Sequence, residues 1–582
     1  MLFALDTIYH QPAKIERRSS RGYWGGKGNK SYEEINMSMI KIGDYTLLKD
    51  GIVVDGTGNK GSRGSVLLNG PLIEKVIYGN TEEKGRVIDC SGLVIAPGFI
   101  DCHSHLDWFM AMENGERFMS PFTEQGITSV VGGNCGFSLA ALSEKMDSRN
   151  EKAVVDNLFK EGLRGINRLP WRSMTEYFQY LSNVGISHNL AMFVGHGSVR
   201  ASIKGLEPSP LTADEKKLML SLMEAAMDEG ARGVSCGLQY EPGQFAPKDE
   251  LEDVARLVKK HDKVLAVHLR AYSAVSAAYP VMPFGTPHNL IALKEILGLA
   301  RRLEVRLQIS HMIFVGTKTW STCDDALEMI DRAIDDGIDV KFDTFAYSHG
   351  APLINSFIPP WFISNTEKNY RSRKALLRLR FELKMLKMLL GIDFEDMQII
   401  RSNNAQLDRF NGMFLGDIAR ERGMNEIENF VDYSEKSGGR AAMIVCKYST
   451  PEIIKKLMKH RASLFMTDAW VEPGENQNSA AYGCFPRFLQ LARDEKLISI
   501  EEAVHKMTGA AAERMRIHDR GVLHEKKAAD IVVFDPAKIR DNNPRECGNM
   551  RPTGIEAVFV NGIQVLKKGI SDVSVKGGTI LR

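Results

Sequence analysis

Eight apolar, strand-like runs alternate with helical stretches through the middle of the chain. They occupy residues 98–103, 127–133, 189–196, 233–240, 263–270, 306–311, 339–347 and 463–468. Several are rich in Val, Ile and Leu without alternation, which is typical of parallel strands that helices cover on both faces. Eight such strands with intervening helices predict an α/β fold, a (β/α)8 TIM-like barrel.

Both ends of the chain show a different pattern, in which short β-runs are separated by turn residues. These runs lie at 45–48, 51–54, 65–68 and 73–78, and again at 529–534 and 558–565. The pair Asn561-Gly562 between alternating apolar runs is a strong signal for a hairpin. We therefore expect residues 41–97 and 515–582 to form one small β domain. The barrel would then occupy 98–514, with a helical insertion at about 348–462, and residues 1–40 would be an extension.

Charge and composition exclude several classes of function. The chain has 582 residues, with 75 Lys and Arg against 73 Asp and Glu, a formal net charge of +2. Such a balance gives no general attraction to nucleic acid or to an anionic membrane, and no apolar run reaches the 18 residues of a spanning helix. The local basic stretch at 371–387 has leucines at helical spacing, which favours a solvated helix face. We expect neither nucleic acid nor a membrane as partner.

Eight cysteines without a C-x-x-C pair favour reduced thiols, and the first 35 or so residues lack the apolar core of a secretion signal. Both observations predict a cytoplasmic protein.

Residues that bind metals well stand at the predicted carboxyl ends of five strands. His103 and His105 are two apart on a strand and therefore point to the same side. Taken singly, a buried histidine is often a satisfied core group, a lone cysteine a small hydrophobe and an aspartate a helix cap. Together the residues match the nitrogen, sulfur and carboxylate ligands of zinc, at the end where a barrel carries its active site. The candidate ligands are His103, His105, Cys135, His268, His311 and Asp468.

At these residues the sequence resembles the amidohydrolase superfamily and, within it, the N-acyl-D-amino-acid deacylases, or D-aminoacylases. The resemblance begins at about Tyr45, leaves residues 1–40 outside, and rests on several motifs in the expected order. These are APGFIDCHSH at 96–105, GGNCGF at 132–137, GHGSVR at 195–200, GLQYEPG at 237–243, YGCFPR at 482–487, AVHKMT at 503–508, Arg520-Gly521 and ADIVVFD at 529–535. The resemblance implies a metal-dependent barrel with a small β-sandwich, and a hydrolase of carbon–nitrogen bonds other than peptide bonds.

The resemblance also implies how the metal is held. In this family a cysteine takes the place of the bridging carbamylated lysine of other amidohydrolases, and here that cysteine is Cys135. With His268 and His311 it would hold the tighter of one or two zinc ions. The second position would be bordered by His103, His105 and Asp468.

Hydrolysis of an amide requires an activated water and a protonated leaving nitrogen. Zinc lowers the pKa of a bound water to about 7. Asp468 would accept the proton of that water and pass it to the departing nitrogen, which is too basic to leave as an anion. Tyr240, at the family's tyrosine position, would donate to the carbonyl oxygen, or would be a buried aromatic residue. Asp107 would orient a ligand histidine, or would lie on a loop.

Two motifs that grip the substrate's α-carboxylate in typical deacylases are altered. The lysine of S-H-x-K is replaced by Ile313, and the arginine of H-P-R-x-Y-G by Ala480. A desolvated carboxylate normally needs such a cation. Arg200 and Arg270, at predicted strand ends, are the candidates to replace the two missing groups as substrate-binding residues.

Three functions remain open on this sequence. The favoured one acts on a small-molecule amide, as an N-acyl-D-amino-acid deacylase that releases a carboxylic acid and a D-amino acid. The alternative is a hydrolase of neutral or cyclic amides, similar to a hydantoinase or dihydropyrimidinase, because the carboxylate-binding Lys and Arg are absent. A non-catalytic scaffold is least favoured, since a scaffold has no need of six convergent ligands.

Overall fold

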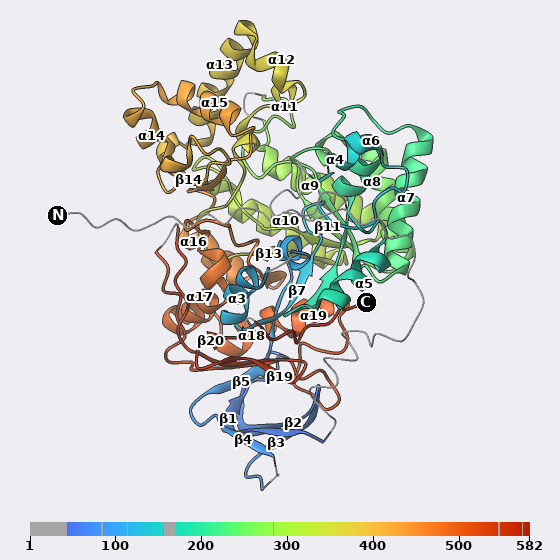
Figure 1. Ribbon diagram of the computed structural model, residues 1–582, viewed down its shortest axis with the longest axis vertical. Helices are drawn as coiled ribbons and strands as arrows, with labels where there is room; N and C mark the ends of the chain where they lie inside the picture. Colours follow the sequence, from blue (N-terminus) through green and yellow to red (C-terminus); the bar gives the residue numbers. More distant parts are fainter. Residues whose placement is uncertain are drawn as a thin grey trace, which may run out of the picture.

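The computed structural model describes residues 43–82, 85–112, 115–152, 154–155, 169–282, 285–544, 547–572 and 574–582. Within these ranges a barrel lies between a small β domain at one end and a helix-rich insertion at the other (Figure 1). The extension expected at residues 1–40 lies outside the described residues.

The barrel of the described chain is built from eight parallel strands. β6-β7-β8 pair in one sheet and β9-β10-β11-β12-β13-β16 in a second, and Phe193 joins β8 to β9. Backbone bonds from Asp468 N to His103 O (3.0 Å) and from His105 N to Ala469 O (3.2 Å) connect the ends of the eighth and first strands. The predicted (β/α)8 barrel is therefore confirmed. Its strands are β6 (Phe99–Asp101), β7 (Ile127–Gly132), β8 (Asn189–Met192) with β9 (Val194–Gly195), β10 (Gly233–Gly237), β11 (Val264–His268), β12 (Arg306–Ile309), β13 (Val340–Thr344) and β16 (Ser463–Phe465).

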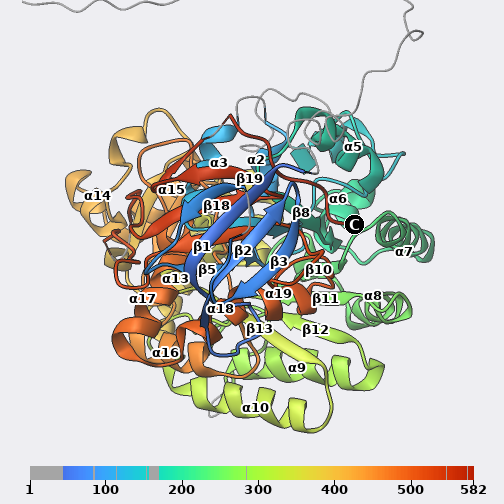
Figure 2. The same cartoon turned by 90° about the horizontal axis from the view of Figure 1, so that it is seen from below.

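Helices surround the strands (Figure 2). In α8, the side chains of Leu251, Val254, Ala255 and Val258 are buried at helical spacing, while most of its charged residues face outward. The longer barrel helices are α3 (Glu116–Glu124), α5 (Met174–Val184), α6 (His196–Lys204), α7 (Ala213–Asp228), α8 (Lys248–Lys260), α9 (His288–Leu303), α10 (Cys323–Asp335), α16 (Pro451–Lys459), α17 (Ala480–Glu495), α18 (Ile500–Met507) and α19 (Gly509–Arg514).

Strands from both ends of the chain form one sheet below the barrel (Figure 2). β5 pairs antiparallel with β17, so that Ile531 faces Pro97, and a separate core includes Leu48 and Phe559. The strands are β1 (Tyr45–Val53), β2 (Ser62–Asn69), β3 (Leu72–Tyr78), β4 (Arg86–Asp89), β5 (Val94–Pro97), β17 (Ile531–Phe534), β18 (Ile555–Val560), β19 (Ile563–Lys567) and β20 (Ile570–Ser571).

Two local predictions in this sheet have different outcomes. The Asn561-Gly562 turn joins β18 to β19 with φ angles of 48° and 78°, as the hairpin signal predicts. The two runs expected at 45–48 and 51–54 are instead one strand, β1. A bulge between Leu48 and Gly51 keeps β1 paired with β2, and Asp50 takes φ 63° within it.

The insertion between β13 and β16 is less helical than expected. It contains the antiparallel pair β14 (Met397–Arg401) and β15 (Ala442–Val445), which the sequence analysis does not predict. Its α-helices before α16 are α11 (Pro360–Ile363), α12 (Thr366–Tyr370), α13 (Arg373–Leu390), α14 (Leu415–Glu421) and α15 (Glu426–Lys436). They share a hydrophobic core that is distinct from the barrel's.

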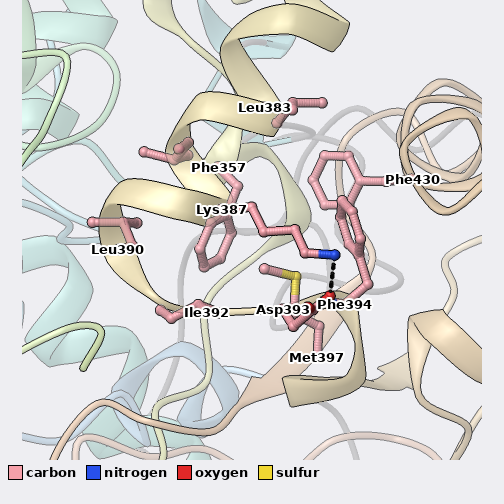
Figure 3. A pocket seen from close by; sticks show the side chains of 10 residues that line it. Phe357, Leu383, Lys387, Leu390, Ile392, Asp393, Phe394, Met397 and Phe430 are labelled. Atoms are coloured by element: carbon pink, nitrogen blue, oxygen red, sulfur yellow. Dashed lines mark hydrogen bonds and ion pairs between the residues drawn. The ribbon is translucent and has the colours of Figure 1, made fainter. Parts of the chain in front are cut away.

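A small apolar cavity lies inside this insertion core, beside α13 (Figure 3). Phe357, Leu390 and Phe430 line it, and the Lys387 ammonium meets the Asp393 carboxylate at 2.5 Å. The cavity contains none of the candidate metal ligands.

Hydrogen bonds and an ion pair join the insertion to the barrel. Phe314 N donates to Tyr448 O (2.9 Å) and Gly316 N to Lys447 O (2.8 Å), which joins the loop after β12 to the segment after β15. Tyr448 N donates in turn to Ser348 O (2.8 Å), at the start of the insertion just after β13. Arg401 pairs with Glu472, after β16, at 2.7 Å.

Across the described residues, no helix is long and apolar enough to cross a membrane. The chain's eight cysteines all lie in this part and are free.

A buried polar network fastens the β domain to the barrel. Asp530, just before β17, accepts from Asn189 Nδ2 of β8 (2.8 Å) and from Asn561 N (2.7 Å), and it pairs with the buried guanidinium of Arg520. Arg520 also pairs with Asp519, whose side chain is 61% exposed.

Asp530→Asn is expected to lower the free energy of unfolding by about 3–5 kcal/mol, because Arg520 loses its buried charge partner. The matched control is Asp519→Asn, which removes the exposed partner of the same arginine and should cost less than about 1 kcal/mol. Urea denaturation followed by circular dichroism measures both. Equal losses in the two variants would contradict the assignment.

Candidate metal centre

The first group of candidate ligands surrounds Cys135 and Asp468. His103 Nε2 lies 3.3 Å from Cys135 Sγ and 3.3 Å from Asp468 Oδ1, and His105 Nε2 lies 3.4 Å from the same carboxylate oxygen. One ligand atom from each of the four residues lies within 4.8 Å of the others. His103 and His105 follow β6, Cys135 follows β7 and Asp468 follows β16.

The second group shares Cys135 with the first. His268, the last residue of β11, places Nδ1 3.7 Å from Cys135 Sγ, and His311, just after β12, places Nε2 at 3.5 Å. All six residues predicted from the sequence therefore converge on one thiol. Two imidazoles and a sulfur on one side, and two imidazoles, a carboxylate and the same sulfur on the other, fit one or two metal ions.

Three of the six residues have a left-handed backbone. Their φ angles are 54° at Cys135, 28° at His311 and 49° at Asp468. A non-glycine residue in this region costs about 1–3 kcal/mol and persists only where its surroundings fix it. On either side of Cys135, a Cβ on Gly133 would lie 2.1 Å from Phe193 O, and one on Gly136 would lie 2.6 Å from Gly237 N. The turn that presents the thiol therefore requires both glycines.

The charges in the cluster favour binding of a cation. Burial raises the pKa of the Cys135 thiol, but the neighbouring His103 and His311 outweigh burial and hold that pKa well below its usual value. The carboxyl of Asp468 behaves in the same way, since His311 and His103 lower its pKa against the effect of burial. Thiolate and carboxylate are the forms that bind metals.

Asp343 is the important residue that the sequence analysis does not identify. It lies on β13, fully buried, and its Oδ1 is 3.2 Å from His103 Nδ1 and 2.6 Å from His311 N. Gln239, after β10, has a similar place beside His268. Its Oε1 lies 3.0 Å from His268 Nε2, the ring nitrogen that does not face Cys135. One signal was available in the sequence of β13, VKFDT. Because side chains alternate along a strand, Asp343 is on the face that points into the barrel.

Two residues with ambiguous predicted roles support the Cys135 turn. Tyr240 donates from its hydroxyl to Cys135 O (2.8 Å), while its ring stacks on Phe137 and meets the edge of His268. Asp107 is buried and accepts from Gly133 N at 3.1 Å, and burial raises its pKa to about 6. Both side chains are therefore hydrogen-bonded to the backbone of the turn that carries Cys135.

Comparison with known proteins agrees with this geometry. Residues 441–566 match the sequence model of the amidohydrolase family. The D-aminoacylase of Alcaligenes xylosoxydans xylosoxydans is 29% identical over 520 residues, which cover 89% of this chain and 94% of that protein. A crystal structure of D-aminoacylase superposes with a TM-score of 0.73 at 26% identity, over 92% of this chain and 99% of that one. The chain is thus similar over most of its length to D-aminoacylases, and over residues 441–566 to the amidohydrolase family.

A further solved structure has the same fold. N-acyl-D-glutamate deacylase from Bordetella bronchiseptica, crystallised with zinc and a phosphonate mimic of the tetrahedral intermediate, superposes with a TM-score of 0.74 at 25% identity, over 92% of this chain and 99% of that one. These similarities identify the protein as a metal-dependent enzyme of the class that hydrolyses carbon–nitrogen bonds other than peptide bonds.

The two arginines predicted to bind substrate in this amidohydrolase are engaged elsewhere. Arg200 is completely buried in α6, not at a strand end; its Nε lies 3.3 Å from Glu250 Oε1, and its Nη2 donates to Ser209 O at 2.8 Å. Arg270 donates to Ala246 O (2.8 Å) and pairs with Glu295 at 3.4 Å. The prediction for Arg200 is corrected because its guanidinium has no solvent-facing side, and the structure gives no support to Arg270.

Aromatic side chains form the rim of the amidohydrolase's metal centre. Trp108 lies 4.5 Å from His105 and 5.4 Å from Trp470, ring centre to ring centre. Phe137 continues the series, 6.5 Å from Trp108 and 5.1 Å from Tyr240. These four aromatic residues are half-buried, so the approach to the ligands is flanked by apolar surface.

Cys135→Ala is expected to lower metal affinity by about 100-fold or more, because both ligand groups lose the same thiolate. Cys236→Ala is the matched control, since Cys236 is buried on β10 but belongs to neither group. Metal content after competition with a chelator, read by mass spectrometry, measures both variants. If Cys135→Ala retained metal as the control does, Cys135 would not be a ligand.

Proposed function

We propose that this amidohydrolase is a zinc-dependent N-acyl-D-amino-acid deacylase. The observation that carries the proposal is the convergence of four histidines and Asp468 on the single thiol of Cys135. Nitrogen, sulfur and carboxylate together form a donor set that suits zinc. The relatives named above, a D-aminoacylase and an N-acyl-D-glutamate deacylase, support the substrate class.

The six ligands would hold the zinc, which when bound supplies the Lewis acidity that makes a water molecule nucleophilic near neutral pH. The chain's own residues then manage the proton. Asp468 has an ionised carboxylate, and its side chain is 25% exposed, so it is reachable from the mouth of the site. It accepts the proton of the attacking water and delivers it to the departing nitrogen.

Stabilisation of the carbonyl oxygen requires a donor beside the thiol. Tyr240 is the closest candidate, since its hydroxyl already lies 2.8 Å from the Cys135 carbonyl oxygen and its ring lies against His268. To serve the substrate, the hydroxyl would exchange this backbone acceptor for the substrate's oxygen. Such a donor stabilises charge that develops during the attack on the carbonyl.

Asp468→Asn is expected to lower kcat by about 10²–10⁴-fold, because an amide cannot carry the proton. The variant should retain most of its metal, since Asp468 is one of four residues in its group. Steady-state kinetics and metal content measure the two effects. Asp494→Asn, at an exposed carboxylate on α17, is the control. A fully active Asp468→Asn enzyme would exclude this residue as the proton carrier.

A second candidate function has its own supporting observation. Ile313 and Ala480 are buried at the positions where carboxylate-binding cations are expected, and both Arg200 and Arg270 are bonded elsewhere. A desolvated free carboxylate would therefore be poorly compensated. A neutral or cyclic amide, such as a hydantoin or dihydropyrimidine, avoids that cost and suits the aromatic rim.

A hydrolysis screen separates the two functions. Zinc-loaded enzyme is assayed with N-acetyl-D- and N-acetyl-L-methionine, with the corresponding methyl ester of the D compound, and with hydantoin and dihydrouracil. The deacylase proposal expects turnover of the free D acid with a preference over the L acid. Turnover of the rings alone would overturn it, and a large preference for the ester would identify the carboxylate as unfavourable.

A further inference from the structure

We propose that Asp343 is a positioning residue. It fixes the orientation of one candidate ligand from each metal group, His103 in the first and His311 in the second. Asp343 lies on β13, whereas the two histidines that it contacts follow β6 and β12. The proposal rests on the metal centre and not on the substrate, so it holds for the deacylase and for the hydrolase of neutral amides alike.

One oxygen of Asp343 serves both groups. Oδ1 lies 3.2 Å from His103 Nδ1, whose other nitrogen faces Cys135 and Asp468. The same oxygen accepts from His311 N at 2.6 Å, and His311 is the residue whose φ of 28° departs from strand geometry. The contact with the imidazole fixes the Nδ1–H tautomer of His103, which leaves the Nε2 lone pair directed into the cluster.

The second oxygen anchors the carboxylate to the barrel interior. Oδ2 accepts from Gln308 Nε2 at 2.7 Å. Gln308 cannot turn its amide around, because its Oε1 accepts from Arg514 Nε at 3.2 Å, and Arg514 is buried and paired with Asp339. Asp343 is therefore required to accept at both oxygens, as a carboxylate does and an amide does not.

The other histidines of the cluster lack an equivalent carboxylate. Within the described residues, the Nδ1 atoms of His105 and His311 are buried without a hydrogen-bond partner. His268 has only the exposed amide of Gln239 at its outer nitrogen. His103 is thus the one imidazole of the set whose orientation is fixed by a buried anion, and its ring lies 5.3 Å from that of His311 and 5.6 Å from that of His105.

The test is a pair of variants built on this hydrogen-bond pattern. Asp343→Asn turns an NH2 group toward the Nε2 donor of Gln308, which the bond to Arg514 prevents from flipping. The carboxamide then cannot keep its contacts with Gln308 and with the two histidines at the same time, and metal affinity is expected to fall about 10–100-fold. The double variant Asp343→Asn/Gln308→Glu restores the donor–acceptor pattern and the total charge. It is expected to bring affinity back to within a few-fold of the wild type.

Affinity is measured on the full-length protein by chelator competition with Zn²⁺, and the geometry by the visible absorption spectrum of the Co²⁺-loaded protein. The single variant should alter the Co²⁺ spectrum and the double variant should restore it. Asp494→Asn is the control, because Asp494 is an exposed carboxylate of α17 outside this network, and both readouts should stay unchanged. Thermal unfolding of each variant verifies that the chain is folded.

Two results would overturn the proposal. Asp343→Asn with wild-type affinity and an unchanged Co²⁺ spectrum would show that the histidines are positioned without it. A folded double variant that fails to recover affinity would show that the negative charge matters and not the positioning. Neither result depends on turnover, so a failed deacylase assay leaves this test intact.

Discussion

The parallel direction of the eight barrel strands is the constraint on which the site depends. Because all eight run the same way, their carboxyl ends meet at one rim, and side chains separated by more than 350 residues reach the same thiol. The candidate ligands come from the first, second, fifth, sixth and eighth strands. The closing bond from Asp468 N to His103 O is therefore part of the candidate site as well as of the barrel, since it joins the backbones of two candidate ligands directly.

The positions of three candidate ligands at this rim depend on strained backbone conformations, which the surrounding fold maintains. Cys135, His311 and Asp468 all leave their strands in left-handed conformations, which turn the side chains inward where an extended chain would carry them past. Each is held by a neighbour on another strand: Tyr240 bonds the carbonyl of Cys135, Asp343 the amide of His311, and His103 the amide of Asp468. The backbone hydrogen bonds thus follow the same cross-strand arrangement as the ligands.

Residue chemistry and period allowed much of this to be predicted from the sequence. Apolar runs that alternate with helical stretches located all eight barrel strands, and the types of residue at their ends identified the six candidate ligands that the structure brings together. The bulge in β1 was missed because a turn-forming Asp50-Gly51 pair looks the same whether a strand ends or bends there. Asp343 was missed because the alternation of its strand shows only the side on which it lies, and not that histidines of two other strands contact it. Arg200 was misplaced because helix α6 begins directly at His196.

The attachments of the insertion have a consequence for the candidate metal centre. Tyr448 is bonded on one side to the loop after β12 and on the other to Ser348, just after β13, and Arg401 pairs with the almost fully buried Glu472 after β16. The insertion therefore links the segments that follow the sixth, seventh and eighth strands. His311 and Asp468 stand in the first and the last of these segments, so a change inside the insertion can alter the spacing of two candidate ligands without contacting either.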